Sequence, residues 1–173
     1  MGLPIQYGIH SANFSNFYSQ YVLYSALKHS DDTLIVLLNR TGSTLETQRI
    51  NAPLVLPNVT SAELNYIAFN IVSNDYHIEL YGNLQNKIAH IRGKNFCSVK
   101  ECDTYIKQQS EYNSSLHYKP SSYVNQNGRI TRYTTLSTFI RNAIDHPNSS
   151  GQFNEHELRT SIELLILLNK AIT

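Results

Sequence analysis

The segment Glu155–Ala171, EHELRTSIELLILLNKA, lies near the end of the chain and decides the predicted fold. Asn154 before it is a favourable N-cap, and Glu157 at the third helical position can complete a capping box. One apolar stripe along the segment consists of Leu158, Ile162, Leu165 and Ile166. Further leucines make the end of this helix apolar nearly all round, so we expect it to be buried on several sides. The second apolar face packs either within one domain or against another subunit.

The remaining sequence predicts a mainly α fold. Helical spacing or capping residues indicate further helices over about 16–28, 61–71, 74–91 and 98–111. The run Thr33–Leu38, TLIVLL, is either a buried strand or the start of a helix, because so short an apolar run does not discriminate between them. We therefore expect a helical bundle of five or six helices with at most a small extended or β element near residues 33–57.

Length and composition set the broad limits. The chain has 173 residues, of which 41% are hydrophobic and 16% charged, which is typical of one globular domain with a real core. We expect one domain over 1–173, with an N-terminal part over 1–60 and a helical core over 61–173. A net charge of +1 excludes binding to nucleic acid by bulk electrostatics alone, so any such surface must be local. The absence of a signal pattern or a membrane-length apolar run predicts a cytoplasmic protein without a membrane partner.

Just before the final helix lies Ser137–Pro147, STFIRNAIDHP, which predicts a second amphipathic helix. Its apolar stripe consists of Leu136, Phe139, Ile140, Ala143 and Ile144. Arg141 lies off this stripe, and Pro147 disfavours helix at His146. In one regular helix His146 would lie about 140° round the axis from Arg141. The two side chains can therefore share a site only if the helix unwinds at its end or if two copies of the chain combine.

Arg141 and His146 have the chemistry of a minimal nuclease site. Cleaving RNA without a metal requires groups that move protons from the 2′-hydroxyl and to the leaving oxygen, and a cation beside the phosphate oxygens. Imidazole titrates near neutral pH, whereas guanidinium stays charged and presents a fork of donors to a phosphate. The alternative is that Arg141 is a surface residue and that Asp145 and His146 simply end the helix.

The run Arg141–His146, RNAIDH, resembles the R-N-x-x-x-H motif of the HEPN superfamily, and a helix after a short loop is a further similarity. Members of that superfamily are compact helical domains and often metal-independent ribonucleases of prokaryotic defence and toxin systems. The resemblance covers roughly the last third of the chain. It implies that two motifs meet across a homodimer, that Arg141 holds the scissile phosphate and that His146 acts as acid or base. Asn142 and Asp145 would be the polar residues within the motif, and no metal or cofactor would be needed.

A second feature lies upstream of the motif, where Tyr112–Ile144 contains neither aspartate nor glutamate. Basic and aromatic residues alternate there, and the candidates for RNA binding are Lys119, Tyr123, Arg129, Arg132 and Tyr133. Cations attract phosphates and aromatic faces stack unpaired bases, so this segment is a possible RNA track. Its polar part, Tyr118–Arg129, is typical of a long loop, and the alternative is a solvated loop without a binding role.

The two cysteines, Cys97 and Cys102, do not indicate a metal site on their own. Their spacing lacks a second cysteine pair, so a zinc site would need two further ligands such as His90 or His117. We expect two reduced structural thiols and no metal.

Two functions of different classes follow from the sequence. The first is a metal-independent endoribonuclease that acts on single-stranded RNA or tRNA, forms a homodimer, and is restrained by an antitoxin or another partner. The second is a non-catalytic helical subunit that docks on a larger protein. The segment 137–165 also resembles segments of ABC- and AAA-type ATPase defence loci, which implies a partner ATPase under either interpretation.

Overall fold

The computed structural model of the protein describes residues 35–41, 44–50, 55–58, 60–124, 127–147 and 151–172. The chain divides into two compact units, residues 1–69 and 70–173. The helix expected near residues 16–28 lies outside the described residues. The expectation of a single domain over the whole chain stays a prediction.

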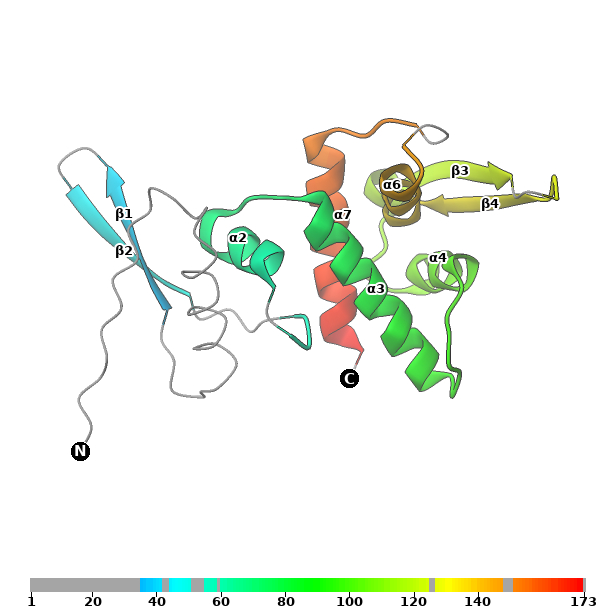
Figure 1. The fold of residues 1–173 in the computed structure, drawn as a ribbon, viewed down its shortest axis with the longest axis horizontal. Coiled ribbons are helices and arrows are strands. Elements are labelled where there is room, and N and C mark those ends of the chain that lie inside the picture. The colour runs from blue at the N-terminus through cyan, green and yellow to red at the C-terminus, as the bar shows by residue number, and fades with distance from the viewer. Residues whose placement is uncertain are drawn as a thin grey trace. The chain divides into compact units, whose positions relative to one another are not determined.

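The described residues of the first unit form one β-hairpin and one helix (Figure 1). Strands β1 (Ile35–Thr41) and β2 (Thr44–Ile50) pair antiparallel, and α2 spans Ser61–Phe69. Of the two alternatives for the apolar run at 33–38, its described part forms a strand. The sequence expectation of a small β element between 33 and 57 is therefore confirmed.

The second unit is a helical bundle that carries a second hairpin. Its elements are α3 (Asn74–Ile91), α4 (Val99–Gln108), α5 (Ser114–His117), β3 (Tyr118–Val124), β4 (Ile130–Thr135), α6 (Leu136–Asp145) and α7 (Glu155–Ala171). With α2, the described residues form six helices, so the fold is mainly α with a small β component, as the sequence predicts. Among these helices none is both long and apolar enough to cross a membrane.

Helices α3 and α7 form the centre of the second unit and run in the same direction. Nε2 of His77 lies 2.9 Å from the hydroxyl oxygen of Ser161, and further along both helices Nδ2 of Asn83 donates to Oδ1 of Asn169 at 2.9 Å. At the end of the pair, Lys87 donates to carbonyl groups in the last turn of α7. A cation is favourable at a helix C-terminus, so Lys87 stabilises the end of α7.

Local sequence signals define the helix ends. Asn154 and Glu157 form the capping box that the sequence predicts, and α7 spans the predicted Glu155–Ala171. Ser98 and Glu101 form a second capping box at the start of α4. The side chain of Thr135 accepts the backbone N–H of Thr138 and so caps α6.

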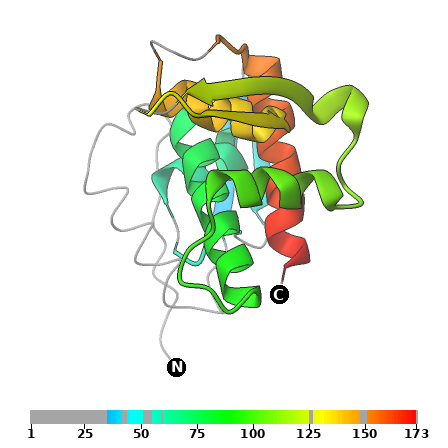
Figure 2. The ribbon, with the colours of Figure 1, turned by 90° about the vertical axis from the view of Figure 1, so that its right-hand side faces the viewer.

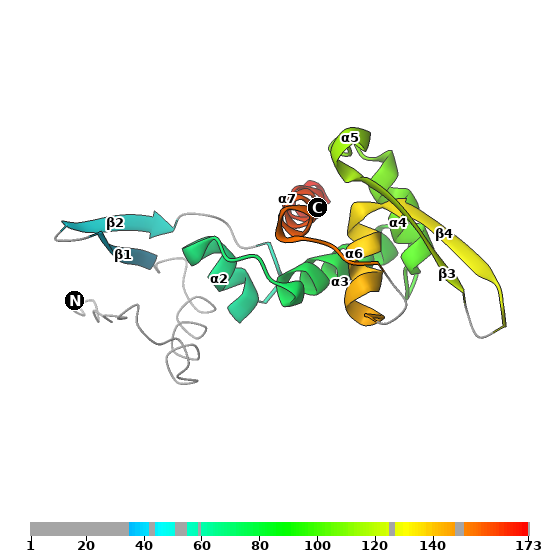
Figure 3. The same ribbon diagram turned by 90° about the horizontal axis from the view of Figure 1, so that it is seen from above.

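The core lies where α6 and α4 pack on the α3–α7 pair. Figures 1 and 3 show α6 between this pair and the β3–β4 hairpin, and Figure 2 shows α4 crossing in front of α3. The fully buried apolar side chains include Leu80, Leu84, Ile88, Ile106, Ile140, Ile162, Leu165 and Leu168. Because α6 lies between the core and the hairpin, its residues can contact both.

The hairpin corrects one prediction, because the polar stretch Tyr118–Arg129 is not a long loop. Its first part forms β3, which pairs antiparallel with β4, and Pro120 lies within the one irregularity of the register. Proline is tolerated at such an irregularity because its missing N–H breaks no ladder hydrogen bond there. Gly128, which follows Asn127, has a φ of 72° and supplies the turn conformation.

Candidate functional site

The R-N-x-x-x-H motif occupies the second half of α6 and its C-terminal cap. The apolar face of α6 is buried as the stripe predicts, and Arg141 lies off this face with its side chain 25% exposed. Asp145 is the last helical residue, and His146 caps the helix with φ −133° and ψ 64°. These angles are not helical, so the 140° separation of a regular helix does not apply to His146. The helix therefore ends before His146, which is the first of the two alternatives, and a site built from two copies stays a prediction.

Three of the four motif residues form one hydrogen-bonded cluster. Nη2 of Arg141 lies 2.7 Å from Oδ2 of Asp145, and Nη1 donates to Oδ1 of Asn142 at 2.9 Å. These contacts use two of the five N–H donors of the guanidinium group. The cluster fixes the orientation of Arg141. The fourth motif residue, His146, is held by its backbone, because its N–H donates to the carbonyl of Asn142 at 2.9 Å.

His146 stacks on Tyr123 of β3. The two ring centroids lie 5.4 Å apart and the ring planes are inclined by 27°. Tyr123 pairs with Thr131 across the hairpin, and the neighbouring pair on the same face is Ser121 with Tyr133. This face of the hairpin therefore lies against α6 and brings an aromatic ring onto the motif histidine.

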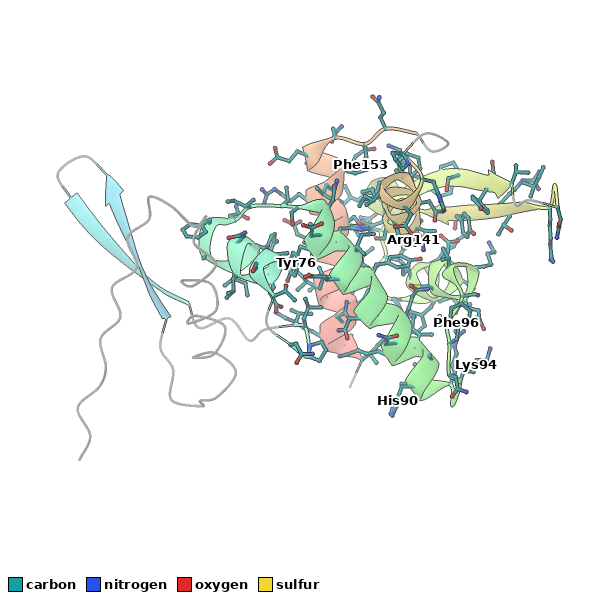
Figure 4. All side chains as sticks on the ribbon, viewed as in Figure 1. Tyr76, His90, Lys94, Phe96, Arg141 and Phe153 are labelled. Carbon is teal, nitrogen blue, oxygen red and sulfur yellow. The ribbon has the colours of Figure 1, made fainter. Side chains whose placement is uncertain are left out.

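Tyr133 joins the same region from β4. Burial raises the pKa of the Tyr133 hydroxyl, and the positive charge of Arg141 offsets part of this rise. Tyr133 is thus close enough to Arg141 to sense its charge, and Tyr123 stacks on His146, so the hairpin and the motif, which are separate features of the sequence, adjoin in the structure. Figure 4 shows Arg141 on α6 beside the hairpin.

The three basic residues of the expected RNA track do not share this site. Arg132 pairs with Ser122, so it lies on the opposite face of the hairpin from Tyr123 and Tyr133. Arg129 precedes β4 next to the turn and is exposed. Successive side chains of a strand point to opposite faces, so the strand keeps Arg132 away from the tyrosines, whereas a loop would not impose this separation.

Lys119 has structural contacts instead of an open position on the track. Its ammonium group pairs with the carboxylate of Glu157 and lies 4.2 Å from the ring centroid of Phe139. These contacts link β3 to the start of α7 and to the apolar side of α6. The charge of Lys119 is therefore largely engaged within the protein.

Beneath the site, a buried carboxylate holds the hairpin to the helices. Asp103 of α4 is 1% exposed, and its Oδ1 accepts the backbone N–H and the hydroxyl of Thr135, each at 2.9 Å. Both carboxylate oxygens also accept the N–H of Thr134 at 3.1 Å. Because Thr135 is the N-cap of α6, Asp103 also places a negative charge at the positive end of that helix.

The buried chain continues from Asp103 into α3. The hydroxyl oxygen of Thr135 lies 3.0 Å from that of Thr138, which in turn lies 2.9 Å from the hydroxyl of Tyr81. Sequence reasoning missed Asp103. Its burial could have been predicted from its position on the apolar face of α4, beside Cys102 and three residues before Ile106.

The cysteines are free thiols and both are buried. Burial raises the pKa of Cys102 to about 12 and also raises that of Cys97. Within the described part of the chain, no three histidine, cysteine, aspartate or glutamate side chains group so as to hold a metal ion. The raised pKa values favour the protonated thiols over the thiolate, which is the reactive form.

Comparison of the chain with models of protein families, with curated proteins and with solved structures found no match.

Proposed function

We propose that the chain is a metal-independent endoribonuclease related to the HEPN superfamily, which acts in the cytoplasm as the effector of a prokaryotic defence or toxin–antitoxin system. The observation that carries the proposal is the stacking of Tyr123 on His146. It joins a possible proton-transfer group to an aromatic ring of the hairpin, beside a guanidinium group fixed by Asp145 and Asn142.

The proposed reaction is internal transesterification of RNA. The 2′-oxygen attacks the adjacent phosphorus, the bond from phosphorus to the 5′-oxygen breaks, and the products carry a 2′,3′-cyclic phosphate and a 5′-hydroxyl. His146 takes the proton from the 2′-hydroxyl or gives one to the 5′-oxygen. Arg141 stabilises the charge that develops on the phosphate oxygens.

One imidazole performs one of the two proton transfers at a time. We propose that the second is performed by His146 of a second copy in a homodimer. A mixture of the wild type with an excess of the His146→Ala variant tests this point. If each site needs His146 from both copies, mixed dimers are inactive and the activity falls below that of the same amount of wild type alone, whereas independent sites keep the activity of the wild-type copies.

The cleavage assay uses labelled single-stranded RNA and tRNA in the presence of EDTA. We expect the wild type to leave cyclic phosphate ends and both single variants to lose activity while they keep cooperative melting. Both substitutions affect partly exposed side chains, and the exposed i,i+4 pair of Arg141 with Asp145 is worth only about 0.3–0.5 kcal/mol. A variant that no longer melts cooperatively would instead give its residue a structural role.

A second candidate is a non-catalytic subunit that docks on a larger protein such as an ABC- or AAA-type ATPase. The observation that favours it is the pair of exposed apolar residues at the end of the hairpin, Val124 and Ile130, each 57% exposed. They pair with each other across the strands. Val124→Asp would then abolish binding to the partner ATPase, Arg141→Ala would leave docking intact, and the wild type would not cleave RNA.

A further inference from the structure

The loop between α3 and α4 presents basic and aromatic side chains to solvent. Residues 80–100 contain no aspartate or glutamate. Arg92 and Lys94 have side chains that are 34% and 53% exposed, and Phe96 is 69% exposed. Phe96 is the most exposed large hydrophobic side chain of the described residues, and Figure 4 shows it beside Lys94 on this loop. Burial in the core does not account for an aromatic ring in this position.

The loop is held on both sides of Phe96. The N–H of Lys94 donates to the carbonyl of Ala89 at 2.9 Å, and the side-chain amide of Gln85 donates to the carbonyl of Cys97 at 2.8 Å. Cys97 itself is buried. The exposure of Phe96 therefore belongs to an anchored loop, and a ligand that contacts the ring meets a preformed surface.

The positive charge of the loop exceeds the negative charge beside it. One carboxylate, Glu101, faces two cations, with Nζ of Lys94 at 2.5 Å and Nη1 of Arg92 at 3.9 Å. A third cation, Lys100, lies closer to the hairpin. Its side chain is 52% exposed, and its ammonium lies 5.8 Å from the ring centroid of Tyr133. The buried Asp103 lies 3.9 Å from the same ammonium.

These cations connect the loop to the candidate site. Lys100 also donates to the carbonyl of Arg132 at 2.5 Å, so α4 and β4 adjoin at this point. The charge of Arg141 also influences Tyr133. Arg92, Lys94 and Lys100 therefore form a basic stripe over the loop and the start of α4, which Tyr133 connects to Arg141, and Phe96 lies within this stripe.

We propose that this stripe binds the single-stranded part of the RNA substrate, with a base stacked on Phe96 and phosphates beside Lys94 and Lys100. The inference rests on the proposed ribonuclease function. A cationic surface with an exposed ring is the arrangement that holds unpaired nucleotides, because phosphates need cations and every base offers a face for stacking.

Fluorescence anisotropy with a short labelled single-stranded RNA tests the stripe, in EDTA and in the His146→Ala background so that the RNA stays intact. We expect Phe96→Ala to weaken binding by about 5- to 150-fold and Phe96→Trp to preserve it. Leu167→Ala is the matched control, because Leu167 is 52% exposed on α7. Equal affinities for the wild type and Phe96→Ala would overturn the proposal, as would an equal loss in Leu167→Ala.

The salt dependence of binding tests the cations. Each phosphate contact to a single strand contributes about 0.7 to the slope of log affinity against log salt, so Lys100→Gln should reduce the slope by that amount. Lys170→Gln removes an exposed cation from α7 and should leave the slope unchanged. Equal slopes for the wild type and Lys100→Gln would contradict the proposal.

Three further outcomes distinguish an RNA-binding stripe from a membrane surface and from the nuclease site. Binding to phosphatidylserine vesicles without binding to RNA would overturn the proposal in favour of a membrane surface. RNA binding that needs Phe96, without any cleavage, would support the stripe and reject the nuclease function. Cleavage at low RNA concentration that is unaffected by Phe96→Ala would support the nuclease and reject the stripe.

Discussion

The ring of His146 lies against the ring of Tyr123, with centroids 5.4 Å apart, although the two residues belong to different elements of the second unit. His146 caps α6 and Tyr123 belongs to β3. An offset aromatic pair of this kind holds an imidazole in a defined orientation. In the proposed mechanism, Tyr123 is therefore a positioning residue for His146.

Replacing Tyr123 should slow cleavage. Because an aromatic pair contributes about 0.5–1.5 kcal/mol, Tyr123→Ala should slow single-turnover cleavage by roughly 2- to 10-fold, whereas Tyr123→Phe keeps the ring and the rate. Tyr118→Ala is a matched control on the same strand, since Tyr118 is 53% exposed. Equal rates for Tyr123→Ala and the wild type would remove Tyr123 from the site.

Asp145 should oppose RNA binding through its ion pair with Arg141. Asp145→Asn removes a negative charge 2.7 Å from the guanidinium group, so we expect RNA affinity to rise by about 2- to 5-fold. Glu163→Gln removes an exposed carboxylate from α7 and serves as the control in the same anisotropy measurement. Weaker binding by Asp145→Asn than by this control would mean that Asp145 contributes to the site in another way.

Asp103 should be essential for the stability of the second unit. Asp103→Ala leaves the N–H groups of Thr134 and Thr135 without their acceptor, so unfolding in urea should require roughly 3 kcal/mol less free energy. Asp75→Ala, at an exposed first-turn position of α3, should cost less than about 1 kcal/mol. Similar losses in both variants would show that the buried network is weak.

His77 should make stability depend on pH. Burial lowers its pKa from 6.5 to about 3, so below pH 6.5 the unfolded chain binds a proton that the folded chain does not. Stability contributed by neutral His77 is therefore complete above pH 6.5 and is lost as the pH falls toward 3. Between pH 7 and pH 5 the loss amounts to about 2 kcal/mol.

The matching variant is His77→Gln, which cannot titrate in this range. Urea denaturation at pH 7 and at pH 5 should show that the free energy of unfolding falls by about 2 kcal/mol less in the variant than in the wild type. The same fall in both proteins would assign the pH dependence to other groups.

Helices with strong local signals could be predicted from the sequence. The apolar stripe and the Asn154–Glu157 capping box define α7, and Pro147 limits α6. The β3–β4 hairpin is not predicted, because the polar composition of this segment is typical of a loop and outweighs two weaker signals, the Asn127–Gly128 turn and the β-branched residues that follow it. Polar strands form when pairing and one buried face compensate for composition.

The candidate site was only half predictable for a related reason. Spacing places Arg141 and Asp145 on one side of a helix, and their ion pair follows from it. The approach of Tyr123 to His146 depends on tertiary packing, which no local pattern encodes. Likewise, only the register of the hairpin shows that Arg132 faces away from Tyr133.

We propose that Arg141 and His146 form a ribonuclease site that needs no metal. Incubation of purified protein with labelled single-stranded RNA and tRNA in EDTA, comparing the wild type with His146→Ala, tests this site. We expect cleavage by the wild type only, with 2′,3′-cyclic phosphate ends. Equal cleavage by both proteins, or cleavage that EDTA abolishes and magnesium or zinc restores, would contradict the proposal.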